Sequence, residues 1–245
     1  MLESGLTEDT RLPRYQRVAE RLRRKIIERN LLPGDQVQSE NALAAEFGIA
    51  PGTARQAIAE LVSEGLLERI HGKGTFVRRP SFERSLFRFF RFVGPDGARV
   101  LPDSQILSIK TKQAPTAIAK QLQLAPKAEV IVIHRLRLIA QQPVLVEEIF
   151  LPAERFAPLL KLSANAFGPL LYPIYEALCG ATVAKASEQL AIELAKPKTA
   201  KALNIDSETP VVVIDRLARG FDGAPLEWRR SRGRADQFQY SIELS

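Results

Sequence analysis

The sequence predicts an α+β protein in which an N-terminal winged helix-turn-helix precedes an antiparallel sheet with helices on one face. Two observations predict this fold class. Residues 33–77 contain two short amphipathic helices that meet at a glycine, followed by a β-hairpin with a basic, glycine-rich tip. Beyond residue 85, apolar strands alternate with short helices. We expect one domain over residues 12–79, a linker over 80–85 and a second domain over 86–245.

The composition is that of a globular protein of one or two domains, with 245 residues, 45% hydrophobic and 26% charged. A formal net charge of +7 favours a polyanionic partner, although the excess of cations is not concentrated in the N-terminal domain. The single cysteine, Cys179, fits a reducing cytoplasm. We recognise neither a secretory leader nor a stretch able to span a bilayer, so we expect a cytoplasmic protein without a membrane partner.

The first helix of the N-terminal domain is predicted by apolar residues that recur at helical spacing between Tyr15 and Ile27. The pair Pro33-Gly34 stops the chain from continuing as a helix. The helix and its flanking residues form a basic cluster, with cations at Arg11, Arg14, Arg17, Arg21, Arg23, Arg24, Lys25 and Arg29. Such a face is either simply solvated or in contact with phosphate groups, and the sequence leaves both interpretations open.

The second and third helices are placed by their end signals. Ser39 is a suitable N-cap for the second helix, and Gly48 supplies the left-handed residue of the turn that follows it. Pro51 fits the first turn of the third helix, and Gly65 ends it. The expected core faces are Ala42, Leu43 and Phe47 in the second helix, and Ala54, Ala57, Ile58, Leu61 and Val62 in the third.

Three polar residues, Thr53, Arg55 and Gln56, lie off the core face in the first turns of the third helix. This is the part of a recognition helix that reaches base edges in the major groove. Arginine matches guanine O6 and N7, and glutamine matches adenine. The alternative interpretation is an ordinary exposed polar face.

The hairpin that follows has strand-like runs at residues 66–70 and 75–77. Between them His71, Gly72 and Lys73 form a tip whose glycine permits a tight turn and whose side chains offer hydrogen-bond donors. We expect this tip to contact DNA in a groove or at a phosphate.

The motifs of this domain are Leu32-Pro33-Gly34-Asp35, Ser39-Glu40, Thr53-x-Arg55-x-Ala57, Glu64-Gly65-Leu66 and Gly72-Lys73-Gly74-Thr75-Phe76-Val77. Together they resemble the DNA-binding domain of the GntR family of bacterial transcription regulators. The resemblance implies DNA contacts at Thr53, Arg55, His71 and Gly72. We add Ser39, Gln56 and Lys73 as further candidates for contact with DNA. The chain departs from the family pattern at Asn41, where an arginine is usual, so the operator sequence does not transfer from relatives.

The second domain contains a weak internal repeat of helix, apolar strand, turn and strand. One copy runs through residues 117–122, 130–136 and 143–145, and the other through 199–203, 210–217 and 225–226. Further strands are expected at 85–93 and 105–112, with a helix over 115–122. Units of this kind pair into one antiparallel sheet, although any two helix–hairpin units look alike.

Two arginines are the most informative residues of the second domain. Alternation along a strand puts Arg135 and Arg137 on the same face of the sheet. Their guanidinium groups repel each other unless an anion lies between them. Either an acid such as Glu147 forms a structural ion pair with them, or a carboxylate or phosphate of a ligand does.

The string Arg135-x-Arg137, Pro143-x-x-x-Glu147, Leu151-Pro152 resembles the effector-binding domain of the HutC subfamily of GntR regulators, the UTRA domain, which shares its fold with chorismate lyase. The resemblance implies that Arg135, Arg137 and Glu147 line a pocket for a small molecule. We add Phe89 from an unusually aromatic early strand, and Trp228 and Arg229 from the last one. These residues favour an anionic effector with an apolar or aromatic body.

We therefore predict a ligand-responsive transcription regulator, a repressor, that binds double-stranded operator DNA as a homodimer with half-sites about one helical turn apart. One alternative is a DNA-binding protein without a small-molecule input. A chorismate-lyase-like enzyme is the other, but His71 belongs to the hairpin tip, and neither His134 nor Cys179 has a catalytic partner nearby in sequence. With 2 histidines and one cysteine, we expect no metal site, and no cofactor.

Overall fold

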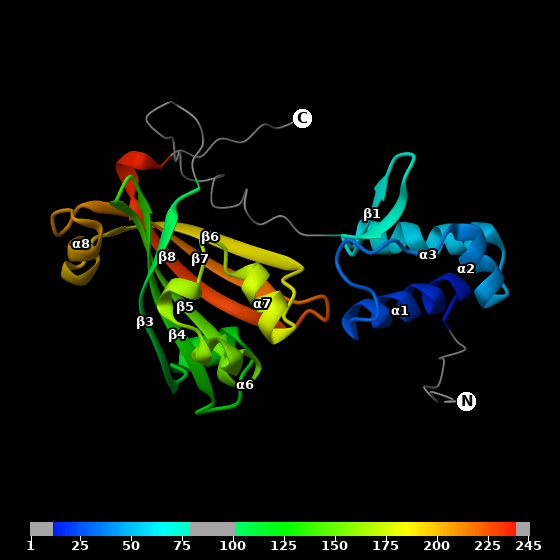
Figure 1. Cartoon of the computed structure of the whole chain (residues 1–245), viewed down its shortest axis with the longest axis horizontal. Coiled ribbons are helices and arrows are strands. Elements are labelled where there is room, and N and C mark those ends of the chain that lie inside the picture. The colour runs from blue at the N-terminus through cyan, green and yellow to red at the C-terminus, as the bar shows by residue number, and fades with distance from the viewer. Residues whose placement is uncertain (1–11, 79–100, 239–245) are drawn as a thin grey trace. The chain divides into compact units, whose positions relative to one another are not determined.

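The computed structural model describes residues 12–78 and 101–238 (Figure 1). The chain divides into two compact units, Met1–Pro80 and Ser81–Ser245, each of which is considered by itself. The expected linker at 80–85 and the expected strand at 85–93, which includes Phe89, lie outside the described residues.

The N-terminal unit is a winged helix-turn-helix of three helices and a hairpin. The helices are α1 (Arg14–Ile27), α2 (Glu40–Phe47) and α3 (Pro51–Ser63), and the hairpin strands are β1 (Leu67–Ile70) and β2 (Gly74–Val77). The Ser39 hydroxyl accepts a hydrogen bond from the amide of Ala42, as an N-cap does. Gly48 adopts the left-handed conformation at φ 60° and ψ 43°, and Pro51 opens α3.

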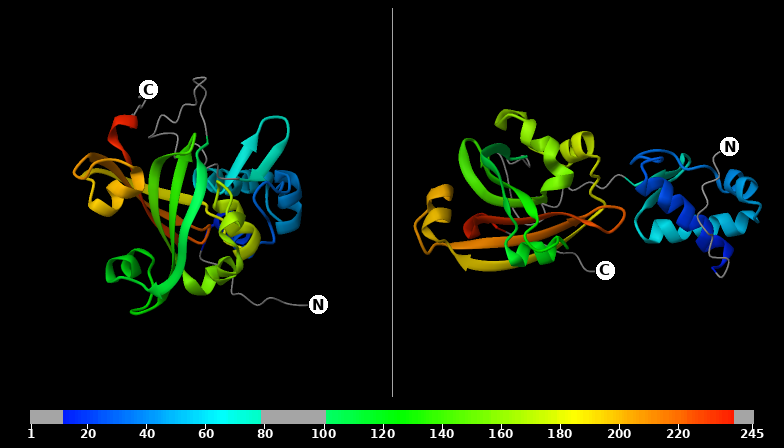
Figure 2. Two further views of the ribbon diagram at one scale, coloured as in Figure 1. Left: turned by 60° about the vertical axis from the view of Figure 1, so that its left-hand side comes forward. Right: turned by 90° about the horizontal axis from the view of Figure 1, so that it is seen from below.

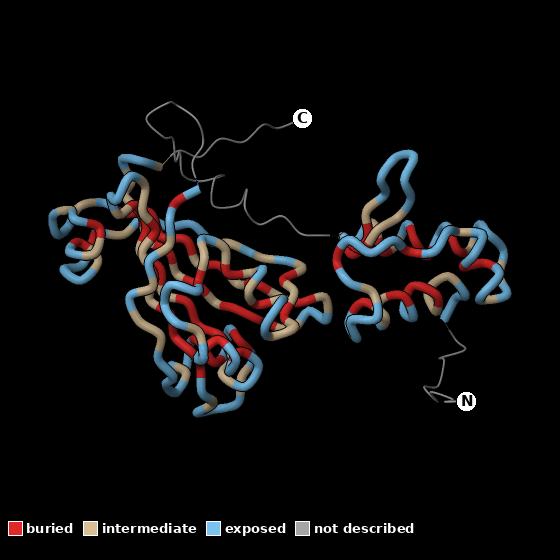
Figure 3. Tube along the Cα trace, viewed as in Figure 1, coloured by how far each residue is buried: buried red, intermediate tan, exposed pale blue. Residues whose placement is uncertain are grey.

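The core of this unit lies between the three helices, as the burial colours show (Figure 3). It contains Val18, Leu22 and Ile26 of α1, Leu43 and Ala44 of α2, and Ala54, Ala57, Ile58 and Leu61 of α3. The expected placement of Ala42 in the core is wrong, because Ala42 is exposed and Ala44 is buried in its stead. The two alanines flank Leu43, and the orientation of the short helix about its own axis decides which of them faces α3.

The hairpin of the winged helix has a tightly specified tip. Gly72 and Gly74 have φ values of 71° and 125°, which side chains with a Cβ rarely adopt. Gln36, from the segment before α2, donates a hydrogen bond from Nε2 to the carbonyl of Lys73 at 3.0 Å. A Cβ on Gly74 would lie only 2.8 Å from the same Nε2 atom, so this position accepts glycine alone without rearrangement.

The C-terminal unit is built on a six-stranded antiparallel sheet with the strand order β3-β4-β5-β8-β7-β6. The strands are β3 (Asp103–Gln113), β4 (Glu129–Ile139), β5 (Gln142–Pro152), β6 (Lys185–Leu194), β7 (Pro210–Arg219) and β8 (Pro225–Arg234). The helices that connect them are α5 (Thr116–Gln121), α6 (Ala153–Phe156), α7 (Tyr172–Cys179) and α8 (Pro197–Leu203), with short 3-10 turns at Ala157–Lys161, Ala164–Ala166 and Ala235–Gln237.

The repeat expected from the sequence corresponds to α5-β4-β5 and α8-β7-β8. Each copy also begins with a strand, β3 in the first and β6 in the second, so that each is a strand–helix–strand–strand unit. The two units meet where β5 pairs with β8, in the middle of the sheet. Residues on these central strands are therefore the most deeply enclosed in the unit.

Helices cover both faces of this sheet (Figure 2). The segment from α6 to α7 packs on Ile131, Ile133 and Ile149, whereas α5 packs on Val130 and Val132 of the same strand β4. Neighbouring residues of a strand point to opposite faces, so these two packing layers lie on opposite sides. The expected antiparallel sheet with helices is confirmed. The expectation that helices cover only one face is wrong, because α5 and α8 pack on the second face. No described helix is long and apolar enough to cross a membrane.

Candidate functional sites

The first candidate site is the polar surface of the recognition helix α3. Arg55 and Gln56 are exposed and Thr53 is half-buried, all within the first two turns of the helix. Arg55 donates from Nε to Oε2 of Glu40 at 2.8 Å. The second oxygen of Glu40 accepts from Nη2 of Arg69, on strand β1, at 3.1 Å. Glu40 and Arg69 were not expected from the sequence.

The other predicted DNA-contacting residues lie in the same unit. His71, Gly72 and Lys73 form the exposed tip of the hairpin. Ser39 is exposed at the start of α2, where its hydroxyl oxygen caps the helix at 3.2 Å from the amide of Ala42. Ser39 therefore has a structural role in addition to any contact with DNA.

Part of the basic surface of α1 is engaged in contacts within the unit. Arg23 forms two hydrogen bonds of 2.7 Å with the carboxylate of Glu64, just after α3, and Lys25 lies 3.4 Å from Glu46 of α2. These ion pairs fix α1 on the other two helices. For Arg23 and Lys25 the structure favours a structural role over contact with phosphate.

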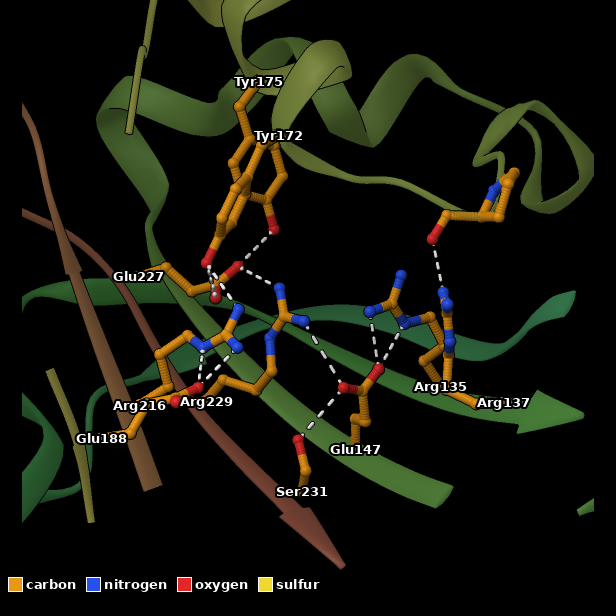
Figure 4. A network of polar contacts seen from close by, with 11 residues as sticks. Arg135, Arg137, Glu147, Tyr172, Tyr175, Glu188, Arg216, Glu227, Arg229 and Ser231 are labelled. Atoms are coloured by element: carbon orange, nitrogen blue, oxygen red, sulfur yellow. Dashed lines mark hydrogen bonds and ion pairs between the residues drawn. The ribbon is translucent and has the colours of Figure 1, made fainter. Parts of the chain in front are cut away.

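The second candidate site is a buried polar network inside the C-terminal unit (Figure 4). Arg135 and Arg137 lie on β4, and Glu147 lies opposite Arg135 on β5. Arg135 binds Oε2 of Glu147 through Nε and Nη2, at 2.6 Å each. The other oxygen of Glu147 accepts from the Ser231 hydroxyl at 3.0 Å and faces Nη1 of Arg229 at 3.4 Å.

The network continues to a second carboxylate, Glu227 on β8. Arg229 donates from Nη2 to Glu227 at 2.8 Å, and the hydroxyls of Tyr175 and Tyr172 donate to Glu227 at 2.8 and 3.3 Å. Beside it, Arg216 of β7 lies 2.5 Å from Glu188 of β6. All of these groups face the side of the sheet that α7 covers (Figure 4).

Several of these residues were missed by the sequence interpretation. For Ser231, Glu227 and Arg216 the sequence did contain a signal that could have identified them as site residues. Glu227 and Ser231 alternate with Arg229 on β8, and Arg216 occupies the place in the second repeat that Arg135 occupies in the first. The tyrosines of α7 carry no such signal, because only the fold brings that helix over the sheet.

Charge is unevenly distributed in the network. Four arginines face three glutamates, and Arg137 has no carboxylate within hydrogen-bond distance among the described residues. Its Nη1 donates to the backbone carbonyl of Pro169. Nε and Nη2 of Arg137, as well as Nη1 of Arg135, are buried and lack an acceptor in the described part of the chain.

The pKa values of these groups reflect the same imbalance. Burial, followed by the positive charge of Arg135, lowers the pKa of Arg137 to about 10. Burial by itself would raise the pKa of Glu147. The positive charges of the surrounding arginines, of which Arg135 has the largest effect, outweigh burial and hold this pKa well below its ordinary value. The carboxylate is therefore ionised, while Arg137 is buried with a positive charge and no carboxylate partner of its own among the described residues.

The assignment of Trp228 to this site is wrong. Trp228 lies next to Arg229 on β8 and therefore points to the other face of the sheet. There its ring packs against Phe150, at 5.5 Å between centroids, and beneath the guanidinium of Arg230 at 5.3 Å. That face carries a separate, wide hollow of about 730 Å³, which Trp228 and Arg230 help to line.

The described residues contain no group of three or more His, Cys, Asp and Glu side chains that could hold a metal ion.

Comparison with models of protein families identifies the family to which the chain belongs. The description "Bacterial regulatory proteins, gntR family" matches residues 14–77, and "UTRA domain" matches residues 98–239. The chain belongs to the GntR family, with a UTRA domain as its C-terminal part. The resemblance of the first part to the GntR family and of the second part to the UTRA domain is thereby confirmed.

The regulator is similar over almost its whole length to named transcription regulators. It is 27% identical over 234 residues to the mannosyl-D-glycerate transport/metabolism system repressor MngR of Escherichia coli, covering 94% of this chain and 95% of the relative. It is 32% identical over 238 residues to the regulator Rv0792c of Mycobacterium tuberculosis, covering 95% and 86%. These relatives are named as transcription regulators and not as enzymes, in agreement with the expectation from the sequence.

Solved structures give the same fold. The ligand-binding domain of a GntR-family regulator from Bordetella bronchiseptica is 27% identical, with a TM-score of 0.54, and covers 58% of this chain and 88% of its own. PhnF from Mycobacterium smegmatis, at 22% identity and a TM-score of 0.54, covers 93% of this chain and 99% of its own. The regulator thus has both domains of this architecture.

Proposed function

We propose that the regulator is a homodimeric repressor whose affinity for operator DNA changes when a small anion binds beside Arg137. Membership of the GntR family supplies the DNA-binding part of this proposal, and the UTRA domain supplies a place for an effector. The observation that carries it is the uncompensated guanidinium of Arg137, buried with two nitrogen atoms that lack an acceptor among the described residues.

Burying a charged group without a counter-charge costs on the order of several kcal/mol of free energy. A carboxylate or phosphate beside Arg137 would accept hydrogen bonds from its free nitrogen atoms and from Nη1 of Arg135. It would also bring the number of negative groups level with the four arginines. Glu147 would then be the internal counter-ion of Arg135, and the ligand that of Arg137.

The chemistry of one relative supports this ligand class. MngR is named for mannosyl-D-glycerate, a molecule that carries a carboxylate. We infer a ligand with one acidic group for the arginines. Any effector alters DNA binding only through a difference in its affinity for the two states of the protein. We propose that both events take place in the bacterial cytoplasm, where the operator DNA lies.

Dimerisation is supported by the edge strand β6. Leu190, Ile192 and Leu194 alternate along it on one side and are 43%, 69% and 60% exposed. In the described sheet β6 has only one neighbour, so its outer edge also presents unpaired backbone groups. Such an edge pairs antiparallel with a second copy of itself about a two-fold axis. We propose this strand as part of the dimer interface.

The dimer is tested by light scattering during size-exclusion chromatography. The wild type is expected at twice the mass of the 245-residue chain, and Ile192→Lys is expected to shift toward the monomer. Lys185→Ala, on the same strand, is the matched control and should remain a dimer. A monomeric wild type would contradict the homodimer, whereas an Ile192→Lys dimer as tight as the wild type would contradict only the β6 interface.

The effector site is tested with a panel of carboxylic acids and phosphate esters. Each compound is screened by thermal shift, and those that stabilise the wild type are titrated by calorimetry. We expect Arg137→Met to abolish binding, and Arg155→Met, which replaces an exposed arginine of α6, to retain it. Equal affinity for wild type and Arg137→Met would contradict the site. If no compound of either class binds, the regulator works without a small anion.

A further inference from the structure

A single carboxylate joins the recognition helix to the hairpin in the N-terminal unit. Glu40, the first residue of α2, accepts from Nε of Arg55 at 2.8 Å through one oxygen and from Nη2 of Arg69 at 3.1 Å through the other. The Glu40 side chain is 26% exposed, while those of Arg55 and Arg69 are 68% and 48% exposed. The acid is thus partly enclosed between two arginines that face solvent.

The contact constrains Arg55 in a specific way. Glu40 accepts from Nε of Arg55, and the two terminal nitrogen atoms of Arg55 have no acceptor among the described residues. These atoms form the fork that reads O6 and N7 of guanine. Arg55 is the one basic residue of α3, so its direction determines what the helix offers to a base as a cation.

Arg69 comes from a different element but ends beside the same carboxylate. It lies on β1, whose last two residues, Arg69 and Ile70, are exposed. The strand leads directly into the hairpin tip at His71. A hollow of about 340 Å³, bordered by Ser39, Glu40, Arg55 and Thr75, opens beside Arg55. Thr75 is the residue of β2 that pairs with Arg69. Arginine side chains and helix N-termini are among the groups that commonly contact the sugar-phosphate backbone of DNA.

We propose that Glu40 is a positioning residue that aims Arg55 at a base, and that Arg69 is a further DNA-contacting residue, for a backbone phosphate. The proposal rests on the proposed binding of operator DNA. A carboxylate near phosphates repels them, and here it is held between two cations, so that the trio carries a net charge of +1. Glu40 therefore directs the arginines while leaving a net attraction for DNA.

If Glu40, Arg55 and Arg69 had only a structural role, the loss of Glu40 would affect DNA binding differently. If Glu40 only tied the hairpin to the helices, its loss would lower the thermal stability and weaken all DNA binding alike. If Glu40 aims Arg55, its loss removes discrimination at one base pair while the removal of a negative charge keeps or strengthens binding to unrelated DNA. The ratio of specific to non-specific affinity thus separates the two interpretations.

The experiment uses the full chain and a duplex selected from a randomised pool by the wild type. Binding is measured by fluorescence anisotropy on this duplex, on single base-pair variants of it and on a scrambled duplex, over a range of salt concentrations. The variants are Arg55→Ala, Glu40→Gln and Arg69→Ala. Glu68→Gln is the control that makes the same change of charge, because Glu68 is a neighbouring half-buried carboxylate on β1 with no hydrogen-bond partner in the described part of the chain. Melting curves verify that each variant is folded.

We expect Arg55→Ala to identify one base pair at which discrimination is lost. Glu40→Gln should lose about tenfold of the preference at that same pair, and Glu68→Gln should lose none. Arg69→Ala should weaken operator and scrambled DNA equally, and reduce the slope of log K against log salt by about 0.9 per arginine.

Glu40→Gln with the full preference of the wild type at the Arg55 base pair would overturn the positioning role. An unchanged salt slope in Arg69→Ala would overturn the phosphate contact. A wild type that selects no duplex at all would overturn the proposed function itself, and this inference with it. A Glu40→Gln variant that melts well below the wild type and binds all duplexes equally weakly would assign the trio to stability alone.

Discussion

Replacing Arg137 by methionine should stabilise the ligand-free regulator. The pKa of Arg137 falls from an ordinary value of 12.5 to about 10 in the folded protein. At about 1.4 kcal/mol per pKa unit, the surroundings disfavour the charged side chain by roughly 3 kcal/mol. Methionine removes this charge and fills most of the same volume. The carbonyl of Pro169 loses its donor, but Pro169 is exposed, so water replaces the bond at a cost of about 1 kcal/mol.

The net effect is a gain of about 2 kcal/mol in the free energy of unfolding of the C-terminal unit. Arg135→Met, two residues away on the same strand, is the matched comparison. It removes both hydrogen bonds of 2.6 Å to Glu147 and leaves that buried carboxylate with weaker pairing. Breaking a buried ion pair in this way costs about 3–5 kcal/mol. The two neighbouring substitutions should therefore change stability in opposite directions.

Differential scanning calorimetry of the full chain measures both effects. For a domain of about 150 residues, 1 kcal/mol shifts Tm by roughly 2–4 °C. We expect the transition of the C-terminal unit to rise by about 4–8 °C in Arg137→Met and to fall by at least about 6 °C in Arg135→Met. If both variants melt below the wild type by similar amounts, Arg137 is already compensated in the ligand-free protein, and the reasoning from its unpaired charge is wrong.

Three further predictions follow from named contacts. Because the pKa of Glu147 is held well below its ordinary 4.5, its contribution to stability is present above that pH and lost as the pH falls through the folded pKa; urea unfolding between pH 6 and pH 3 should thus show a weaker acid dependence in Glu147→Gln. Tyr175→Phe leaves the buried carboxylate of Glu227 without one donor and should lower the free energy of unfolding by about 1–3 kcal/mol, measured in urea. Ser39→Ala removes the N-cap of α2 and should cost about 1 kcal/mol in the melting transition of the N-terminal unit; Ser63→Ala, whose hydroxyl donates within α3, tests whether any serine substitution does the same.

The sequence specified the N-terminal unit well because its structure follows from local signals. Ser39, Gly48 and Pro51 each fix a helix end by their own chemistry, and each is found at the expected helix end. The face of α2 was less certain, since only its packing against α3 selects Ala44 over Ala42. The contact of Glu40 with two arginines was not predictable, because it joins three elements that meet only in the folded unit.

The C-terminal unit was predictable where alternation along one strand decides the outcome. Arg135 and Arg137 share a face, as alternation predicted. Glu147, which was one of the two sources of negative charge considered from the sequence, lies opposite Arg135 in the hairpin. The same rule, applied to β8, separates Trp228 from Arg229, and its neglect led to the wrong assignment of Trp228. Tyr175 reaches the network from α7, and no pattern within that segment announces the contact.

The measurement that tests the central claim most directly is a crystal structure of the regulator with the anion that stabilises it most in the thermal-shift panel. The account predicts a carboxylate or phosphate oxygen within hydrogen-bond distance of Nε or Nη2 of Arg137, the nitrogen atoms that lack an acceptor among the described residues. An anion bound elsewhere, such as in the hollow beside Trp228 on the opposite face of the sheet, with Arg137 still paired only to Pro169, would contradict it.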